Sequence, residues 1–419
     1  MTDALIKDAE PDLAAKMAAP SGLAVPCTES IASRARAAAP ALAAADAQSG
    51  SLRRLSDESW NLIAGTGILR ALQPQRWGGT ETSIVDFAEG VIEIGRSSAS
   101  AGWVSSVVGV HPWQIALFSD EGQQDVWGRN PARALASSYT PTGTIEKVPG
   151  GYRVSGRWSF SSGIERCDGV ILGSIDGERE INGSSYPDFI SAVLNRDQYT
   201  VEDVWHTAGL KGTGSNNIVV DGVFVPAHRV QSHLEYTKGL GAQLPGQQHN
   251  TAALYRVPWA VLFNLIIAAG ALGSVYGFLD LWTAETAGRR TNYGTLLRDE
   301  PIVQDRLAEA TFAIDGARLR LVRAGREILE IAEANEVPSE EQRAYYRWDL
   351  AKGAQSAVDA VSDLMRSASG RTAYVEHPLH GKFQDVMAAS GHAFLFSDPL
   401  GRAYAGRKLG STKVPEVHL

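Results

Sequence analysis

Two adjacent serines followed by a glycine, Ser161-Ser162-Gly163, are the first residues in this sequence that could do chemistry. They place two hydroxyl groups beside a flexible backbone position, where hydrogen bonds to a bound molecule could form. Before them, apolar or aromatic residues alternate with polar ones in Tyr152–Ser155 and Arg157–Ser161. This pattern predicts two half-buried antiparallel strands, the first launched by a Gly-Gly turn at Gly150 and the second by a Ser-Gly turn. The alternative is an ordinary hairpin with a serine-rich turn.

A histidine in an apolar helical segment, His111, is a second candidate. Imidazole titrates near neutral pH, so it could move a proton to or from a substrate. A single histidine on an apolar helix is more often a hydrogen-bonded residue of a core or interface. Both interpretations of His111 stay open at this point.

The composition narrows the class of function. The chain has 419 residues, 44% hydrophobic residues and a formal net charge of −8. Its length suggests two or three domains, and a negative chain without a run of Lys and Arg is not expected to bind nucleic acid. The two cysteines, Cys27 and Cys167, lie far apart and indicate cytosolic thiols. We expect no metal site, because there is no HExxH motif, carboxylate pair or Cys/His cluster.

The elements that must position these residues form three predicted domains of an α+β chain. Helical spacing before residue 133, strand-like runs up to about residue 236 and long helices after residue 257 predict an α domain, a β domain and a four-helix bundle. The predicted boundaries are a flexible leader 1–21, a helical domain 22–133, a β domain 134–236, a linker 237–256 and a bundle 257–419.

Local signals support the helices. Ser56 looks like a helix start, and Ser339 with Gln342 has the spacing of a capping box. The leader carries acidic residues and no apolar core, so it predicts neither a signal peptide nor a transit peptide. Val257–Leu279 is apolar enough to imitate a membrane span, but Asn264 and several small residues interrupt it. We expect a buried bundle helix in a cytoplasmic protein that binds no membrane.

Three motifs resemble the acyl-CoA dehydrogenase superfamily. SGRWSFSSG around Gly156 resembles the strand pair that carries a hydroxyl residue against the flavin ring, and the turn Pro74–Gly79 resembles one in the N-terminal helical domain. Gly209–Pro226, GLKGTGSNNIVVDGVFVP, closely follows the superfamily signature, although a β-hairpin with turns is also expected there. The sequences of these motifs more closely resemble those of a side branch of the superfamily, the two-component (group D) phenol hydroxylases, such as the 4-hydroxyphenylacetate and 3-hydroxy-secosteroid hydroxylases. The resemblance covers nearly all of the chain after the leader. It implies a helical domain, a central β-barrel-like domain and a C-terminal four-helix bundle.

The resemblance also implies the residues that contact flavin. Ser162 would hydrogen-bond flavin N5, and Arg290 would reach the flavin of a neighbouring subunit, with a solvated charge at a helix end as the alternative for Arg290. Thr213 and Ser215 are weaker candidates, since their motif is partly structural. The remaining implied contacts are Ser138, Tyr139 and Thr140 of the flavin-edge loop, and Phe160 and Ser161.

The C-terminal segment separates two chemistries. Where acyl-CoA dehydrogenases place a catalytic glutamate, this chain has Ala393, which cannot remove an α-proton, and His392 stands beside it. The phenol hydroxylases resemble this arrangement, with a histidine near the flavin, and they have another histidine facing the substrate at a position that His111 matches. Trp103 is then a further substrate contact. Departures from the family pattern at His380, Gly381, Lys382 and Gln384 put the flavin contacts of that loop in doubt but leave Asp385 and His392 in register.

The function that the resemblance implies is the oxygenase component of a reduced-flavin-dependent monooxygenase acting on a phenol. Reduced FMN or FAD would react with O2 to a C4a-hydroperoxyflavin that hydroxylates the ring, and His392, with His111, would handle the proton of the substrate. No GxGxxG motif follows a strand, so a separate NAD(P)H:flavin reductase would supply reduced flavin by diffusion. The resemblance also implies a homotetramer. The alternatives are a monooxygenase acting on an indole, a thioether or an amine nitrogen, an acyl-CoA dehydrogenase, which Ala393 disfavours, and a non-catalytic oligomer.

Overall fold

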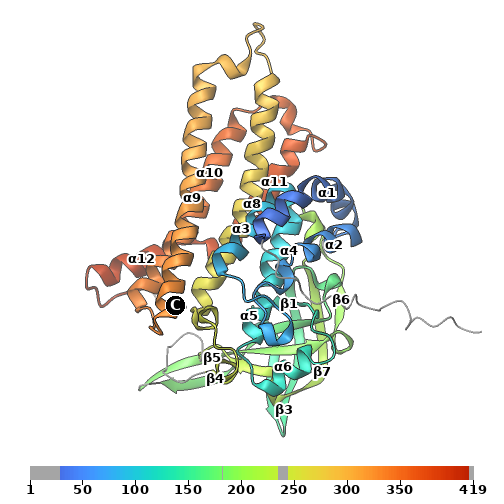
Figure 1. The fold of residues 1–419 in the computed structure, drawn as a ribbon, viewed down its shortest axis with the longest axis vertical. Helices are drawn as coiled ribbons and strands as arrows, with labels where there is room; N and C mark the ends of the chain where they lie inside the picture. Colours follow the sequence, from blue (N-terminus) through green and yellow to red (C-terminus); the bar gives the residue numbers. More distant parts are fainter. Residues whose placement is uncertain (1–28, 182, 235–243, 415–419) are drawn as a thin grey trace, which may run out of the picture.

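The structure is a computed structural model that describes residues 29–181, 183–234 and 244–414. The predicted leader 1–21 and the first part of the predicted linker 237–256 lie outside the described residues. Helices form the first part of the described chain (Figure 1). They are α1 (Ile31–Leu52), α2 (Asp57–Gly65), α3 (Ile84–Ser97), α4 (Ala99–Gly109), α5 (His111–Ile115) and α6 (Asp120–Trp127). The Ser56 hydroxyl accepts a hydrogen bond from the Ser59 amide at 3.1 Å, which confirms the predicted helix start.

The described strands form two four-stranded sheets, in the orders β1-β4-β5-β8 and β2-β3-β7-β6. β1 and β4 run parallel, and the other paired strands of these sheets run antiparallel. The buried Trp158 indole donates to the Gly173 carbonyl at 2.8 Å and so ties one sheet to the other. The strands are β1 (Leu135–Ser138), β2 (Thr144–Val148), β3 (Gly151–Ser161), β4 (Gly169–Ile181), β5 (Ser184–Asn195), β6 (Thr200–Glu202), β7 (Asn216–Pro226) and β8 (Val230–Ser232).

The Ser-Gly turn expected between two strands is wrong. Residues 151–161 form the single strand β3, and Gly156 is a bulge with φ +146° at a register shift against β7. A Cβ at Gly156 would lie 2.5 Å from the Gly143 Cα, so a glycine is needed here for close approach rather than for a turn. Opposite the bulge, the Gly222 amide donates to the Ser155 hydroxyl at 2.8 Å. β7 is one continuous strand that pairs antiparallel with β6, so the motif 209–226 supplies part of a loop and the second strand of an antiparallel pair.

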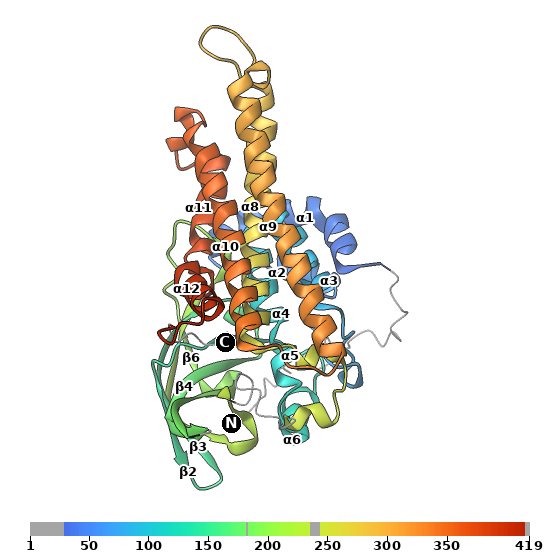
Figure 2. The ribbon, with the colours of Figure 1, turned by 90° about the vertical axis from the view of Figure 1, so that its left-hand side faces the viewer.

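Long helices form the C-terminal part and confirm the predicted bundle. They are α8 (Trp259–Gly288), α9 (Pro301–Glu333), α10 (Glu340–Arg366) and α11 (Pro378–Ser390), with α12 (Ser397–Lys408) packed against α10. Ser339 and Gln342 form the expected capping box at the start of α10. In both ribbon views, the turn between α8 and α9 lies at the end of the molecule opposite the β sheets (Figure 1, Figure 2).

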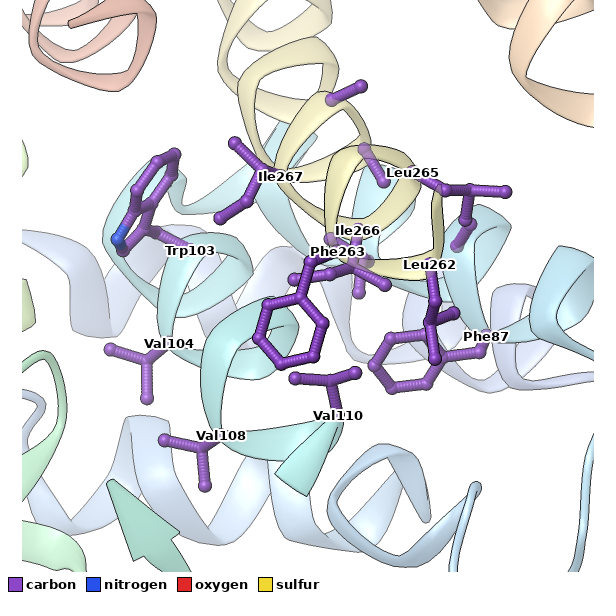
Figure 3. Close-up of a cluster of buried hydrophobic side chains, with 14 of the residues drawn as sticks. Phe87, Trp103, Val104, Val108, Val110, Leu262, Phe263, Leu265, Ile266 and Ile267 are labelled. Atoms are coloured by element: carbon purple, nitrogen blue, oxygen red, sulfur yellow. The ribbon is translucent and has the colours of Figure 1, made fainter. Parts of the chain in front are cut away.

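Helix α8 is the core of the bundle. It is long and apolar enough to cross a membrane, but its most apolar window is completely buried in the protein, as expected for a bundle helix. It lies directly against α3, where a Cβ on Gly95 would come within 2.9 Å of the Gly273 Cα. Side chains of α8, including Phe263 and Ile266, also pack against Val110 and α4 (Figure 3). This close contact joins the N-terminal helices to the bundle above the sheets.

Candidate active site

A chain of three buried hydroxyl groups lies where β3 ends. Ser162 Oγ is 2.7 Å from Ser215 Oγ, which is 2.7 Å from Thr213 Oγ1. The Thr213 hydroxyl donates its proton to the Leu210 carbonyl at 2.9 Å. Because that proton is used, Ser215 must donate to Thr213, and Ser162 must donate to Ser215. The lone pairs of Ser162 are therefore left to accept a hydrogen bond from a bound molecule.

Ser162 lies near an exposed aromatic ring and near two serine hydroxyls that hold neighbouring strands together. Phe160 is 71% exposed although it is a large apolar side chain, and its φ of +66° is unfavourable for a residue with a Cβ. Ser161 is buried and donates to the Ser137 carbonyl at 3.2 Å, while Ser138 donates to the Ser159 carbonyl at 2.7 Å. These two hydroxyls hold β1 against β3. An exposed ring held in a strained conformation beside a free acceptor fits a flat, hydrogen-bonding ligand.

An aromatic cluster lies between the helices and the sheets. Its rings contact one another in an unbroken series, with centroids 4.6 to 6.4 Å apart. It joins segments far apart in the sequence, and it contains four of the predicted site residues, Trp103, His111, Tyr139 and His392. We call the following residues the aromatic cluster: Trp103, His111, Tyr139, His233, Trp259, Phe263, His392 and Phe394.

His392 lies at one end of this cluster, 5.8 Å from the Trp103 ring. Its Nδ1 accepts a hydrogen bond from the Phe394 backbone amide at 3.2 Å. Burial lowers the pKa of His392 to about 4, so the ring is neutral at neutral pH. A neutral imidazole that accepts at Nδ1 carries its proton on Nε2. His392 therefore offers a hydrogen-bond donor at Nε2.

His111 lies at the other end and has both ring nitrogens occupied. Nδ1 is 2.6 Å from the Leu135 carbonyl, to which it must donate, and Nε2 is 2.9 Å from the Ser137 hydroxyl. Burial lowers its pKa to about 4. In the neutral ring Nε2 accepts the Ser137 proton, so any proton reaching His111 would pass through Ser137. The sequence prediction missed Ser137, since only the paired strands bring it to His111.

Tyr139 turns away from the hydroxyl chain and into the aromatic cluster. Its hydroxyl donates to Gln114 Oε1, and the Gln114 amide donates to Ser191 Oγ at 3.3 Å. Ser191 in turn is hydrogen-bonded to the ring of His233. Burial raises the pKa of Tyr139 well above its usual range. A series of hydrogen-bonded side chains thus runs from Tyr139 to His233 within the aromatic cluster. Thr140, which follows Tyr139 in the sequence, is exposed.

The loop that carries the hydroxyl chain is fastened to α11. Asp385 accepts a hydrogen bond from the Leu210 amide at 2.7 Å, and burial raises the pKa of Asp385 to about 6. A Cβ on Gly209 would lie 2.0 Å from the Gln384 carbonyl oxygen, so the backbones touch here. This contact fixes the position of Thr213, and through it Ser162, relative to the segment that carries His392.

Two features lie away from this site. Arg290 is exposed in the turn between α8 and α9, where it donates to the Gly294 carbonyl at 2.6 Å, so one chain does not bring it to Ser162. A cavity of about 540 Å³ is lined by Tyr152, Arg179 and His228, among others. It contains none of the residues of the hydroxyl chain or the aromatic cluster, so it is not the candidate active site.

Comparison with known proteins agrees with this geometry. Residues 265–396 match the family "Acyl-CoA dehydrogenase, C-terminal domain". The chain is 37% identical over 369 residues to the flavin-dependent monooxygenase, oxygenase subunit HsaA, of Rhodococcus jostii, covering 87% of this chain and 93% of that protein. It is 30% identical to the oxygenase component of an FADH2-dependent resorcinol hydroxylase from a Rhizobium strain, covering 87% and 90%.

A solved structure gives the same result. The chain superposes on the crystal structure of 3-HSA hydroxylase from Rhodococcus sp. RHA1 with a TM-score of 0.85 at 32% identity, covering 93% of this chain and 98% of that one. The protein therefore has the acyl-CoA dehydrogenase-like fold and belongs to the oxygenase subunits of the flavin-dependent monooxygenases.

Proposed function

We propose that this monooxygenase hydroxylates a phenol with reduced flavin and O2. The observation that carries the proposal is the direction of the hydroxyl chain, which leaves Ser162 as an acceptor at the end of β3. Reduced flavin has a proton on N5, whereas oxidised flavin has none. An acceptor at this position therefore favours the reduced form. When bound, reduced flavin activates O2 and supplies the oxygen atom that enters the ring.

The residues that would hold the flavin follow from the site. Ser162 would accept from N5, and Phe160 would lie against the flavin with its exposed ring, at the tip of β3. Thr140 and the backbone of the flavin-edge loop lie next in the chain to β1. Ser138, Ser161 and Thr213 would act by holding these groups in place, because their hydroxyls are engaged within the protein.

The aromatic cluster would receive the substrate. An aromatic ligand gains from edge and face contacts with surrounding rings such as that of Trp103. His392 would donate its Nε2 proton to the phenolic oxygen and thereby stabilise negative charge on it. His111 would complete the site from the opposite end through the Ser137 hydroxyl.

The pKa difference between a phenol and the two histidines makes full proton transfer to either histidine before the reaction unfavourable. A phenol has a pKa near 10, and both imidazoles have pKa values of about 4. A difference of about 6 pKa units makes such a transfer unfavourable by about 8 kcal/mol. The phenolic proton would therefore move only as the ring is oxygenated, or leave through another acceptor. The neutral histidines also favour a second candidate, the oxygenation of an indole, which needs no deprotonation.

The names of the relatives support a separate partner component. The names "oxygenase subunit" and "oxygenase component" belong to relatives that work with another component, and a separate NAD(P)H:flavin reductase would serve this chain in the same way. The flavin would be reduced FMN or FAD. A homotetramer would allow Arg290 to reach the flavin of a neighbouring subunit. The protein would act in the cytoplasm.

The test is to mix the purified protein with a separate flavin reductase, NADH and a panel of phenols and indoles. We expect hydroxylated phenol only when the reductase or chemically reduced flavin is present, and no oxidation of NADH by the protein alone. Tightly bound oxidised FAD together with acyl-CoA-dependent reduction of a dye would contradict the proposal.

A further inference from the structure

A buried arginine without a counter-charge lies against the aromatic cluster. Arg347 of α10 is 6% exposed, and its guanidinium carbon lies 5.1 Å from the centroid of the Phe394 ring. That ring is itself 5.8 Å from the His392 ring and 5.7 Å from the Trp259 ring. The Phe394 ring therefore contacts both the guanidinium of Arg347 and the ring of His392, which we expect to contact the substrate.

Only part of the hydrogen-bonding capacity of Arg347 is used. Its Nε donates to Asn264 Oδ1 at 2.7 Å, but its Nη1 is buried without a partner. Among the described residues no carboxylate lies within ion-pair distance of it, whereas other buried or half-buried arginines, such as Arg318, have one. The indole Nε1 of Trp259, whose ring lies 5.7 Å from the Phe394 ring, is also buried without a partner.

This arrangement is costly unless something completes it. A buried charge without a partner destabilises a protein, and a buried donor without an acceptor adds to that cost. Asn264 fixes the direction of the guanidinium, since its amide also donates to the Phe394 carbonyl. The fixed fork of an arginine fits a carboxylate.

We infer that the substrate carries a carboxylate and that Arg347 binds it, with the Trp259 indole as a second donor to the same end of the molecule. The substrate class is then a hydroxylated aromatic acid, whose ring would contact the rings of the aromatic cluster near His392 and whose carboxylate would reach Arg347 beside Phe394. This inference rests on the proposed function for the position of the ring, but the recognition of the anion can be tested without catalysis.

The test is equilibrium dialysis under anaerobic conditions, with and without photoreduced FMN, using phenolic acids and their uncharged amides. A suitable panel is 3-hydroxybenzoate, 4-hydroxyphenylacetate and 3-(4-hydroxyphenyl)propionate. We expect at least one acid to bind about tenfold to a hundredfold more tightly than its amide, as a charge-assisted hydrogen bond provides. Arg347→Met should abolish this preference and leave the affinity for the amide nearly unchanged, while Arg347→Lys should keep part of it.

Arg343→Met is the matched control, because Arg343 is buried one turn earlier on the same helix and also has an unpaired nitrogen. It should keep the preference for the acid. Equal binding of acids and amides by the wild type, or an equal loss for both in Arg347→Met, would overturn the inference. So would a change of oligomeric mass in Arg347→Met, since the guanidinium would then pair with a neighbouring subunit. A preference for acids in a protein that hydroxylates nothing would leave this inference standing and reject the proposed function.

Discussion

The direction of a single hydroxyl proton decides what Ser162 can do. Because Thr213 donates to a carbonyl, the protons of Ser215 and Ser162 follow in one direction, and Ser162 is left as an acceptor. The sequence motif predicted a hydroxyl at this position. It could not predict its polarity, which depends on a loop about fifty residues further along the chain.

Replacing Ser162 tests this polarity. Ser162→Ala should still bind reduced flavin but release more hydrogen peroxide per NADH consumed, since the loss of one hydrogen bond costs about 1 to 3 kcal/mol. The measurement is the ratio of peroxide to hydroxylated product. Ser161→Ala is the control, because the Ser161 hydroxyl fastens β3 to β1, so its loss should affect stability more than coupling. Unchanged coupling in Ser162→Ala would make Ser162 a structural turn residue.

Replacing His392 separates a hydrogen-bond donor from a base. His392→Ala should lower hydroxylation by about 10²–10³-fold, as removal of a donor to a developing charge does. His392→Gln can donate but cannot act as a base, and it should keep much more activity than alanine. If His392 were the base, both variants would be equally impaired.

The pH dependence gives an independent test of the same residue. With a pKa of about 4, His392 stays neutral as the pH falls from 8 to 5.5, so the rate should show no inflection near 6.5. The pKa of His392 is lower in the folded protein than in the unfolded chain. The free energy of unfolding should therefore be constant above about pH 6.5 and fall as the pH drops from about 6.5 toward 4. The pH–rate profile, measured with the reductase in excess, checks this expectation, and a fall in rate through pH 6.5 would contradict it.

At the scale of the elements, local patterns were sufficient for helices and misleading for one strand. The starts of α2 and α10 could be predicted because a cap is a contact between residues three apart. Gly156 could not be assigned from its neighbours, since a glycine with positive φ serves a turn or a bulge equally well. Only the pairing of β3 with β7 decides between them.

The fastening of the hydroxyl-chain loop to α11 predicts an unusual pH dependence of stability. The pKa of Asp385 is about 6 in the folded protein and near 4 when unfolded, so the folded state binds the proton more tightly. The free energy of unfolding therefore falls by about 2 to 3 kcal/mol as the pH rises from about 4 to 6 and Asp385 loses its proton. Asp385→Asn keeps the acceptor for Leu210 and removes the charge, so it should be more stable than wild type at pH 8.

The measurement for Asp385→Asn is denaturant unfolding at pH 5, 6, 7 and 8. The difference between variant and wild type should grow from pH 5 to between pH 6 and 7, where the carboxyl of Asp385 becomes fully ionised, and stay constant from there to pH 8. If the free energies of unfolding of the variant and the wild type differed by the same amount at every pH, ionisation of Asp385 would not destabilise the folded protein. Gly209→Ala in the same loop should be destabilised equally at all these pH values, because its added Cβ meets the Gln384 backbone and changes no charge.

At the scale of the whole molecule, the aromatic cluster was beyond sequence reasoning. Trp103, His111, Tyr139 and His392 were predicted from the resemblance, but Trp259 and Phe394, which join Tyr139 to His392, carry no motif of their own. They come together only because α8 and the segment before α12 meet above the sheets. The buried Arg347 was missed for the same reason, since any arginine on a helix looks solvated in a sequence.

The predicted homotetramer has a testable surface on α9. Phe312 and Leu319 are 80% and 70% exposed and, seven residues apart, lie on one face of the helix. Phe312→Lys with Leu319→Lys should lower the assembled mass measured by light scattering, because two charges would enter the interface. Leu409→Lys, which changes an exposed leucine directly after the end of α12, is the control. A tetramer that survives the double substitution would assemble through another face.

Helix α8 has a consequence for how the chain is made. When Gly288 leaves the ribosome, the cell holds a 30-residue helix as apolar as a membrane span, and α9, α10 and α11, which cover one side of it, have not been synthesised. The helices α3 and α4 already exist, and the close contact of Gly95 with Gly273 gives them a surface on which α8 can dock at once. The glycines at this crossing would then protect the nascent chain from aggregation and from the membrane-insertion machinery, well before there is an active site to support.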